Sequence, residues 1–174
     1  MENMIAANQF IVRSLGECVP GELVQLVSHE HILFGLVLAD AAENRVHVGL
    51  LGPINNAGRL YNYKANANRI VLSYGTNWFL KPLPSDAVTW PGNNNALHHS
   101  GRLTISRDGY CLRFSELPDD PYGDDAIFNL SQSTIVDAAG QDPMPFRGFA
   151  IWENEAASLR KDHHLLEVAI EADA

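Results

Sequence analysis

Three apolar runs between residues 22 and 51 form the most hydrophobic part of the sequence and indicate its fold class. They read Glu22-Leu-Val-Gln-Leu-Val-Ser28, Ile32-Leu-Phe-Gly-Leu-Val-Leu-Ala39 and Arg45-Val-His-Val-Gly-Leu-Leu51. The middle run is apolar on both faces and only eight residues long, which favours a buried strand over a helix. Its neighbours alternate more clearly, and the polar residues 40–44 have the length of a hairpin connection. We predict three antiparallel strands around which the rest of the chain packs.

The size and composition are those of an ordinary globular protein. The chain has 174 residues, 46% of them hydrophobic and 19% charged, which fits a single β-rich domain or two β units at about 1–87 and 88–174. No apolar run approaches the length of a bilayer span, and the N-terminal residues lack the pattern of a secretory signal, so we expect a cytoplasmic protein without membrane association. Cys18 and Cys111 are then expected to be two reduced thiols.

The negative charge is concentrated in the second half of the chain. Of the net charge of −9, residues 1–87 contribute −1 (six basic, seven acidic) and residues 88–174 contribute −8 (six basic, fourteen acidic). An acidic surface repels the phosphates of nucleic acids. We therefore expect no nucleic-acid partner, and either a basic protein partner or a small polar ligand.

Further strands and one short helix are predicted outside the central runs. Residues 154–161 have a helix pattern with Asn154 as its N-cap, and residues 165–170 could extend this helix or form a last strand. Pro82 and Pro84 should end the strand at 78–80 or place it at a sheet edge. The strands are predicted at 9–13, 60–63, 69–74, 78–80, 126–130, 134–136 and 147–152.

The segment 102–115 carries the clearest hairpin signal. Asp108-Gly109 suits a two-residue type I′ turn. That turn pairs Ile105 with Leu112 and Leu103 with Phe114 on one apolar face. Altogether the sequence predicts an all-β fold, an antiparallel barrel or sandwich of about eight to eleven strands with a short C-terminal helix. The meander at 22–51 resembles part of an SH3-like small barrel, a likeness that does not fix a function.

Histidines provide the main candidates for a metal site. Side chains two apart on a strand point the same way, so His29 and His31 could face one divalent ion such as Zn, Fe, Mn or Ni, joined by His98 or His99. The His-x-His pattern resembles that of cupins, which implies a metal-dependent β-barrel enzyme. The glutamate that cupins carry about four residues later is absent, since Gly35 and Leu36 stand there. The structural alternative is a tight turn between two strands.

Other side chains favour binding without catalysis. No nucleotide-binding glycine motif, nucleophile elbow or paired Cys-x-x-Cys is present, so whether the protein is an enzyme stays open. Trp78 and Trp90 belong to a region rich in aromatic and asparagine residues, which suits a glycan or peptide groove. The acidic residues Asp119, Asp120, Asp124 and Asp125 suit a basic partner. The leading hypothesis is therefore a non-enzymatic binding module.

Overall fold

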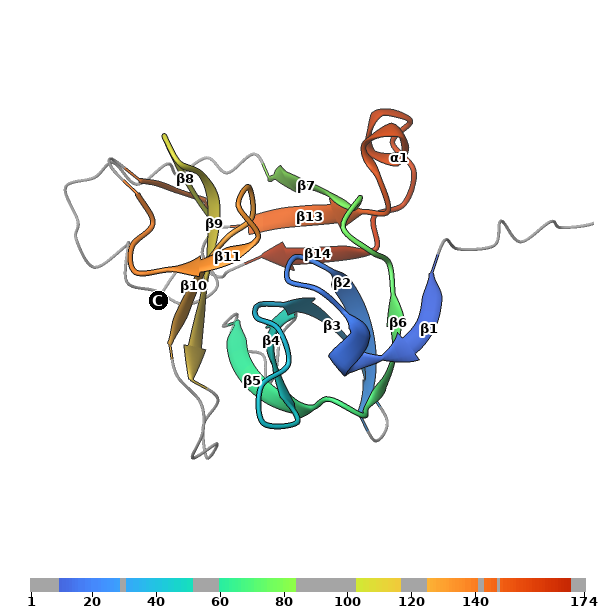
Figure 1. Cartoon of the computed structure of the whole chain (residues 1–174). Coiled ribbons are helices and arrows are strands. Elements are labelled where there is room, and N and C mark those ends of the chain that lie inside the picture. Colours follow the sequence, from blue (N-terminus) through green and yellow to red (C-terminus); the bar gives the residue numbers. More distant parts are fainter. Residues whose placement is uncertain are drawn as a thin grey trace, which may run out of the picture.

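The computed structural model describes residues 10–28, 31–51, 60–83, 103–116, 125–140, 143–146 and 148–169 (Figure 1). They form fourteen strands, a 3₁₀ turn η1 (Leu15–Glu17) and one helix, α1 (Glu155–Leu159). The strands are β1 (Ile11–Ser14), β2 (Leu23–Ser28), β3 (His31–Val37), β4 (Arg45–Leu51), β5 (Tyr61–Asn66), β6 (Ile70–Ser73), β7 (Phe79–Pro82), β8 (Leu103–Ser106), β9 (Gly109–Glu116), β10 (Ala126–Asn129), β11 (Thr134–Val136), β12 (Met144–Phe146), β13 (Gly148–Trp152) and β14 (Leu166–Ala169). The all-β prediction is confirmed, with more strands than expected.

The predicted meander is the centre of a curled sheet. Strands β2, β3, β4 and β5 pair antiparallel in sequence order, and β6 returns to pair with β2 on one side and β1 on the other. Glu43 and Asn44 both have positive φ, at 50° and 60°, as a two-residue type I′ turn requires. Two hydrogen bonds of 2.8 Å between Ala42 and Arg45 close this turn.

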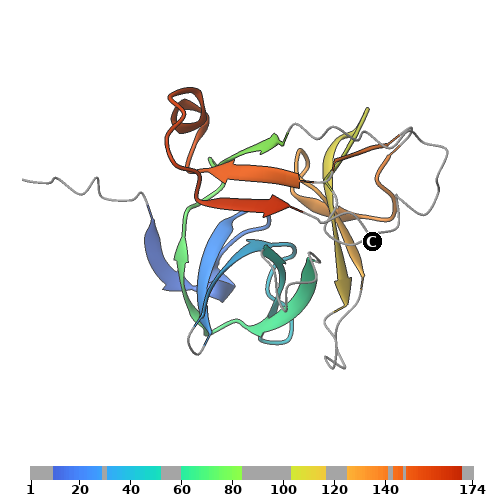
Figure 2. The ribbon, with the colours of Figure 1, turned by 180° about the vertical axis from the view of Figure 1, so that it is seen from behind.

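The second half of the chain extends this sheet and adds another. Strand β9 pairs parallel with β5 at Tyr61↔Ser115, and β8, β10, β11 and β12 follow on from β9. Strands β14, β13 and β7 form a separate three-stranded sheet that lies above the curled sheet in Figures 1 and 2. Strand β7 is at its edge and ends at Pro82, as the prolines predict. Every pair except β5–β9 is antiparallel.

Two hydrophobic cores lie on opposite faces of the curled sheet. The core inside the curl includes Val24, Val37, Val46, Val48 and Val71. The core on the other face joins the two halves of the chain, and includes Leu23, Leu36, Leu38 and Leu51 together with Leu103, Leu112, Phe114, Phe128, Phe149 and Ile151. Because strands β2 to β4 contribute to both cores, their apolar residues occupy both faces.

Strand β3 carries the doubly apolar run, and only its second half is covered on both faces. Leu36 and Val37 are 0% exposed and belong to different cores. Ile32, at the start of the strand, is 63% exposed, although its residue type predicts burial. The outer face of the sheet is therefore filled at one end of β3 and bare at the other.

Two glycines in the meander allow neighbouring side chains to lie directly against the sheet backbone. A Cβ on Gly35 would stand 2.5 Å from Cγ1 of Val48, inside the curl. A Cβ on Gly49 would stand 2.4–2.8 Å from three ring atoms of Phe114, which is 0% exposed. The ring of Phe114 thus lies directly on the backbone of β4 and attaches β9 to the curled sheet.

The predicted register of the 102–115 hairpin is wrong. Leu103 pairs with Leu112 and Ile105 with Tyr110, so Arg107 and Asp108 form the turn. Neither of these two turn residues has positive φ, whereas the next residue, Gly109, has φ of 109°. This pattern suits a type I turn followed by a left-handed residue rather than a type I′ turn. The slip preserves the faces, and Leu103, Leu112 and Phe114 are all buried as predicted.

The physical reason is a contact from another strand. The buried Asn129 of β10 donates from Nδ2 to the carbonyl of Asp108 at 3.0 Å. A Cβ on Gly109 would also meet Oγ of Ser131 at 2.2 Å. The turn is thus shaped by its tertiary neighbours rather than by its own sequence.

Smaller predictions have mixed outcomes. Asn154 caps α1 through a 2.8 Å hydrogen bond from the Ala157 N–H, as predicted, and residues 166–169 take the strand alternative. Strand β12 lies outside the predicted strands, and it pairs with β8 despite Pro145. Cys18 and Cys111 are free, as expected, and both are buried. None of the helices in the described part of the chain is long and apolar enough to cross a membrane.

Candidate functional site

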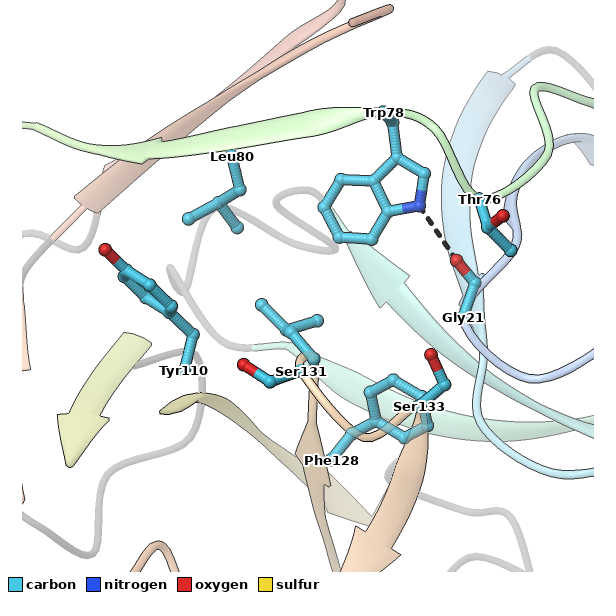
Figure 3. A pocket seen from close by; sticks show the side chains of 9 residues that line it. Gly21, Thr76, Trp78, Leu80, Tyr110, Phe128, Ser131 and Ser133 are labelled. Carbon is cyan, nitrogen blue, oxygen red and sulfur yellow. Dashed lines mark hydrogen bonds between the residues drawn. The ribbon is translucent and has the colours of Figure 1, made fainter. Parts of the chain in front are cut away.

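A pocket of about 220 Å³ lies where the sheets meet (Figure 3). Its residues come from the turn before β2, from the β6–β7 segment, and from the β9–β11 region. They are Gly21, Thr76, Trp78, Leu80, Tyr110, Phe128, Leu130, Ser131 and Ser133. A pocket of this kind can be formed only when the two halves of the chain are assembled.

Trp78 forms one wall with its indole fixed in place. Its Nε1–H donates to the carbonyl oxygen of Gly21 at 2.8 Å, drawn as a dashed line in Figure 3. Because the polar edge of the ring is engaged, the apolar face of the indole is available to the pocket. Leu80 lies on the same side, and Tyr110 stands across from Trp78 (Figure 3).

The opposite wall is the turn between β10 and β11. Oδ1 of the buried Asn129 accepts hydrogen bonds from the backbone N–H groups of Ser131 and Gln132, at 2.9 and 3.0 Å. Ser133 has φ of 51° and lies against Gly21, where a Cβ would stand 2.6 Å from its Oγ. Gly21 has φ of 89°, so the close approach and the backbone both favour glycine.

The pocket lining is uncharged but can form hydrogen bonds. None of its nine residues is acidic, basic or histidine. The side-chain hydroxyls of Thr76, Tyr110, Ser131 and Ser133 form no hydrogen bond to any other residue that the structure describes. A hydroxyl can both donate and accept. The lining therefore suits a neutral ligand that has an apolar face and hydrogen-bonding groups.

Two of the predicted binding residues can be placed. Trp78 lines the pocket, whereas Trp90, Asp119, Asp120 and Asp124 lie outside the described residues. Asp125 accepts a hydrogen bond from the Glu116 N–H at 3.1 Å, and its other oxygen lies 3.3 Å from Nη2 of Arg113. This carboxylate therefore joins β9 to the start of β10, and its role as a partner contact remains a prediction.

The predicted metal ligands are not brought together by any described contact. Strand β2 ends at Ser28 and β3 begins at His31, with these two residues paired. His29, His98 and His99 lie outside the described residues, as does the side chain of His31. Within the described ranges, no three His, Cys, Asp or Glu side chains form a group that could hold a metal ion. The metal site at these histidines stays a prediction.

The two thiols lie in surroundings that oppose ionisation. Burial, followed by the nearby Glu22 carboxylate, raises the pKa of Cys18 from its ordinary value of 9.0 to about 12. Burial and then Asp108 raise the pKa of Cys111. Since the thiolate is the nucleophile, neither cysteine is suited to nucleophilic catalysis.

Glu22 near Cys18 is part of a buried polar network. It is 4% exposed, and its Oε2 accepts from Oγ of Ser73 at 2.5 Å. Its Oε1 accepts from the Val19 N–H at 3.3 Å and lies 3.4 Å from Nη1 of Arg13. These contacts satisfy a carboxylate that would otherwise be costly to bury, so the network has a structural role between β1, β2 and β6.

Most of the pocket could not be found in the sequence. Trp78 was singled out as an aromatic residue in a polar region, but Tyr110, Ser131 and Ser133 lie more than thirty residues away along the chain. The local signals are turn-forming sequences at Val19-Pro-Gly21, at Gly75-Thr-Asn77 and at residues 129–133, and none of them indicates a pocket. In comparisons with known proteins, no family model matches this chain, and no curated protein or solved structure is significantly similar to it.

Proposed function

We propose that the protein is a non-enzymatic binding module whose pocket at Trp78 holds a small uncharged molecule. The observation that carries this proposal is an indole, fixed by its hydrogen bond to Gly21, in a pocket lining that has four hydroxyl-bearing side chains and no charge. Apolar walls with a few placed polar groups are typical of small-molecule sites. Acid–base chemistry needs titratable groups near the reacting atoms, and apart from the Tyr110 phenol the lining has none.

The size and polarity of the pocket limit the ligand. A volume of about 220 Å³ equals roughly seven water molecules at about 30 Å³ each, which is room for a single ring. A charged ligand would lose its hydration without gaining an ion pair, so it should bind much more weakly than a neutral one. A monosaccharide or a phenol therefore matches the site better than a carboxylate or an amine.

The test is a chemical-shift titration of the ¹⁵N-labelled full chain with four ring-sized probes. The probes are glucose, phenol, benzoate and benzylamine, each up to the millimolar range. We expect at least one neutral probe to shift the indole N–H of Trp78 and the backbone of Thr76 and Ser131, and the charged probes to bind at least tenfold more weakly. If no probe shifts these signals, or if the charged probes bind as well as the neutral ones, the proposal is wrong.

Two variants and a matched control complete the test. Trp78→Ala removes the wall, and Ser131→Trp fills the pocket from an exposed position, so each should abolish the shifts. Trp152→Ala is the control, since Trp152 also donates from Nε1 to a backbone carbonyl, that of Asp162 at 3.1 Å, but lies outside the pocket lining. Binding retained by both pocket variants would contradict the proposal.

The acidic second half offers a separate contact. A basic protein partner and a cytoplasmic location both remain predictions from the sequence, and neither depends on the pocket. Pull-down of a partner that is lost when Asp119, Asp120, Asp124 and Asp125 are neutralised would support such a contact alongside ligand binding.

A further inference from the structure

The pocket at Trp78 has its hydroxyl groups at different depths. Gly21 is buried and Ser133 is half-buried, whereas Thr76, Tyr110 and Ser131 are exposed. Water therefore reaches three of the four hydroxyl-bearing side chains at the rim of the pocket. Ser133 supplies the hydroxyl that a ligand would meet inside.

The Ser133 hydroxyl and the Gly21 carbonyl form a polar corner at one end of the pocket. A Cβ on Gly21 would stand 2.6 Å from Oγ of Ser133, so the hydroxyl lies directly against the backbone of Gly21. The Gly21 carbonyl oxygen accepts from Nε1 of Trp78 at 2.8 Å, and a carbonyl can accept a second hydrogen bond through its other lone pair. Figure 3 shows Gly21 and Ser133 on the side of the indole nitrogen. The polar corner thus offers one group that can donate and two that can accept.

The rest of the inner wall is apolar. Phe128 is 0% exposed, and the half-buried Trp78, Leu80 and Leu130 pack against the same core. Leu80 lies at the end of the pocket away from Gly21 (Figure 3). A ligand that enters therefore meets hydrocarbon along most of its length and hydrogen-bonding groups at one end.

We infer that the pocket takes an aromatic ring with a single hydroxyl group, that is a phenol, rather than a monosaccharide. This inference rests on the proposed function and chooses between the two neutral classes that it allows. The flat ring of a phenol can lie against the face of Trp78, and its hydroxyl can donate to the Gly21 carbonyl and accept from Ser133. A monosaccharide carries hydroxyls around its whole ring, and those against Leu80 and Phe128 would lose water without gaining a partner.

The Ser133 hydroxyl is the specificity-determining group in this arrangement. Toluene has the shape of phenol with a methyl group in place of the hydroxyl, so the two probes differ mainly in what they can do at the polar corner. Loss of one hydrogen bond of ordinary strength changes an affinity by about three- to tenfold. Removal of the Ser133 hydroxyl should therefore weaken the binding of phenol by this factor and leave the binding of toluene unchanged.

The test is a chemical-shift titration of the ¹⁵N-labelled full chain with phenol, toluene and glucose, followed at the indole N–H of Trp78. The original chain should bind phenol at least about tenfold more tightly than glucose. Ser133→Gly removes the hydroxyl at a position whose φ of 51° suits glycine, and it should weaken phenol about three- to tenfold but not toluene. Ser158→Gly is the control, the same change at a half-buried residue of α1 outside the lining, and it should alter neither affinity.

The outcomes separate the phenol preference from the proposed function. If glucose binds as tightly as phenol, or if Ser133→Gly leaves the affinity for phenol unchanged, the pocket still holds a neutral molecule but the inference is wrong. If no probe shifts the Trp78 signal, the proposed function fails as well. If Ser133→Gly weakens phenol and toluene equally, the shape of the pocket has changed, and Ser133→Ala, which keeps the Cβ atom, decides. An unchanged preference for phenol over toluene in Ser133→Ala would then overturn the inference.

Discussion

The two ends of strand β3 differ in what covers them, and the difference shows how the molecule is built. At Leu36 the outer face of the sheet lies under strands from the second half of the chain, and the side chain is 0% exposed. At Ile32, four residues earlier on the same face, the exposure is 63%. Both positions carry apolar residues, so the sequence of the strand does not distinguish them. Only the position that lies under other strands becomes part of the core.

Substitutions at the covered end of β3 should lower the stability of the fold the most. Leu36→Ala should lower the free energy of unfolding by about 2–5 kcal/mol, because it leaves a cavity between the halves of the chain. Ile32→Ala, the matched change at the bare end, should cost less than about 1 kcal/mol. Urea denaturation measures both. Similar losses of unfolding free energy for the two variants would contradict the difference in burial between the two ends of β3.

The contact between Gly49 and Phe114 tests the attachment of the second half. Gly49→Ala should cost about 1–3 kcal/mol, since the new methyl group meets a ring that is fully buried. Phe114→Leu removes the ring atoms involved and should lessen the cost of Gly49→Ala in a double-mutant cycle. Additive losses would show that these two residues are not coupled.

A pH dependence is expected from Cys18, which lies in the core inside the curl. Its pKa is about 12 in the folded chain and near 9.0 when exposed, so the unfolded chain loses the thiol proton first as the pH rises. The contribution of the protonated Cys18 thiol to folding stability is therefore fully present below about pH 9 and is lost between pH 9 and 12. Cys18→Ala should make this fall shallower in denaturation curves, and an unchanged slope would contradict the assignment.

The smallest effect is expected at the surface where β9 meets β10. Asp125→Asn weakens an exposed ion pair with Arg113 but leaves an oxygen to accept from the Glu116 N–H, so it should cost less than about 1 kcal/mol. Asp125→Ala removes both contacts and should cost more than the asparagine variant. Thermal denaturation compares them, and equal losses would mean that the backbone contact adds nothing.

The sequence predicted those features that depend on neighbouring residues. The meander at 22–51, the Asn154 cap and the edge position of β7 follow from short-range patterns, and the structure has them. The turns were harder. A type I′ turn was predicted at Asp108-Gly109, where contacts from Asn129 and Ser131 impose a different turn. Glu43 and Asn44 have the two positive φ angles that a type I′ turn needs, in a connector for which only the length was predicted.

Features that depend on distant residues were not predictable. The apolar run at 32–39 indicated burial on both faces but not that its first residues would stay bare, because that depends on where the second half of the chain lies. For the pocket, Trp78 could be selected by residue type, whereas its neighbours Gly21 and Ser133 are brought there by sheet packing. No spacing in the sequence carries that information.

The direct test of ligand binding at Trp78 is a crystal of the protein soaked with whichever neutral probe gives the larger shifts. We expect density for the ring against the face of Trp78, with its polar groups within hydrogen-bond distance of the Thr76, Ser131 or Ser133 hydroxyls. Density at another surface, with this pocket empty, would contradict it.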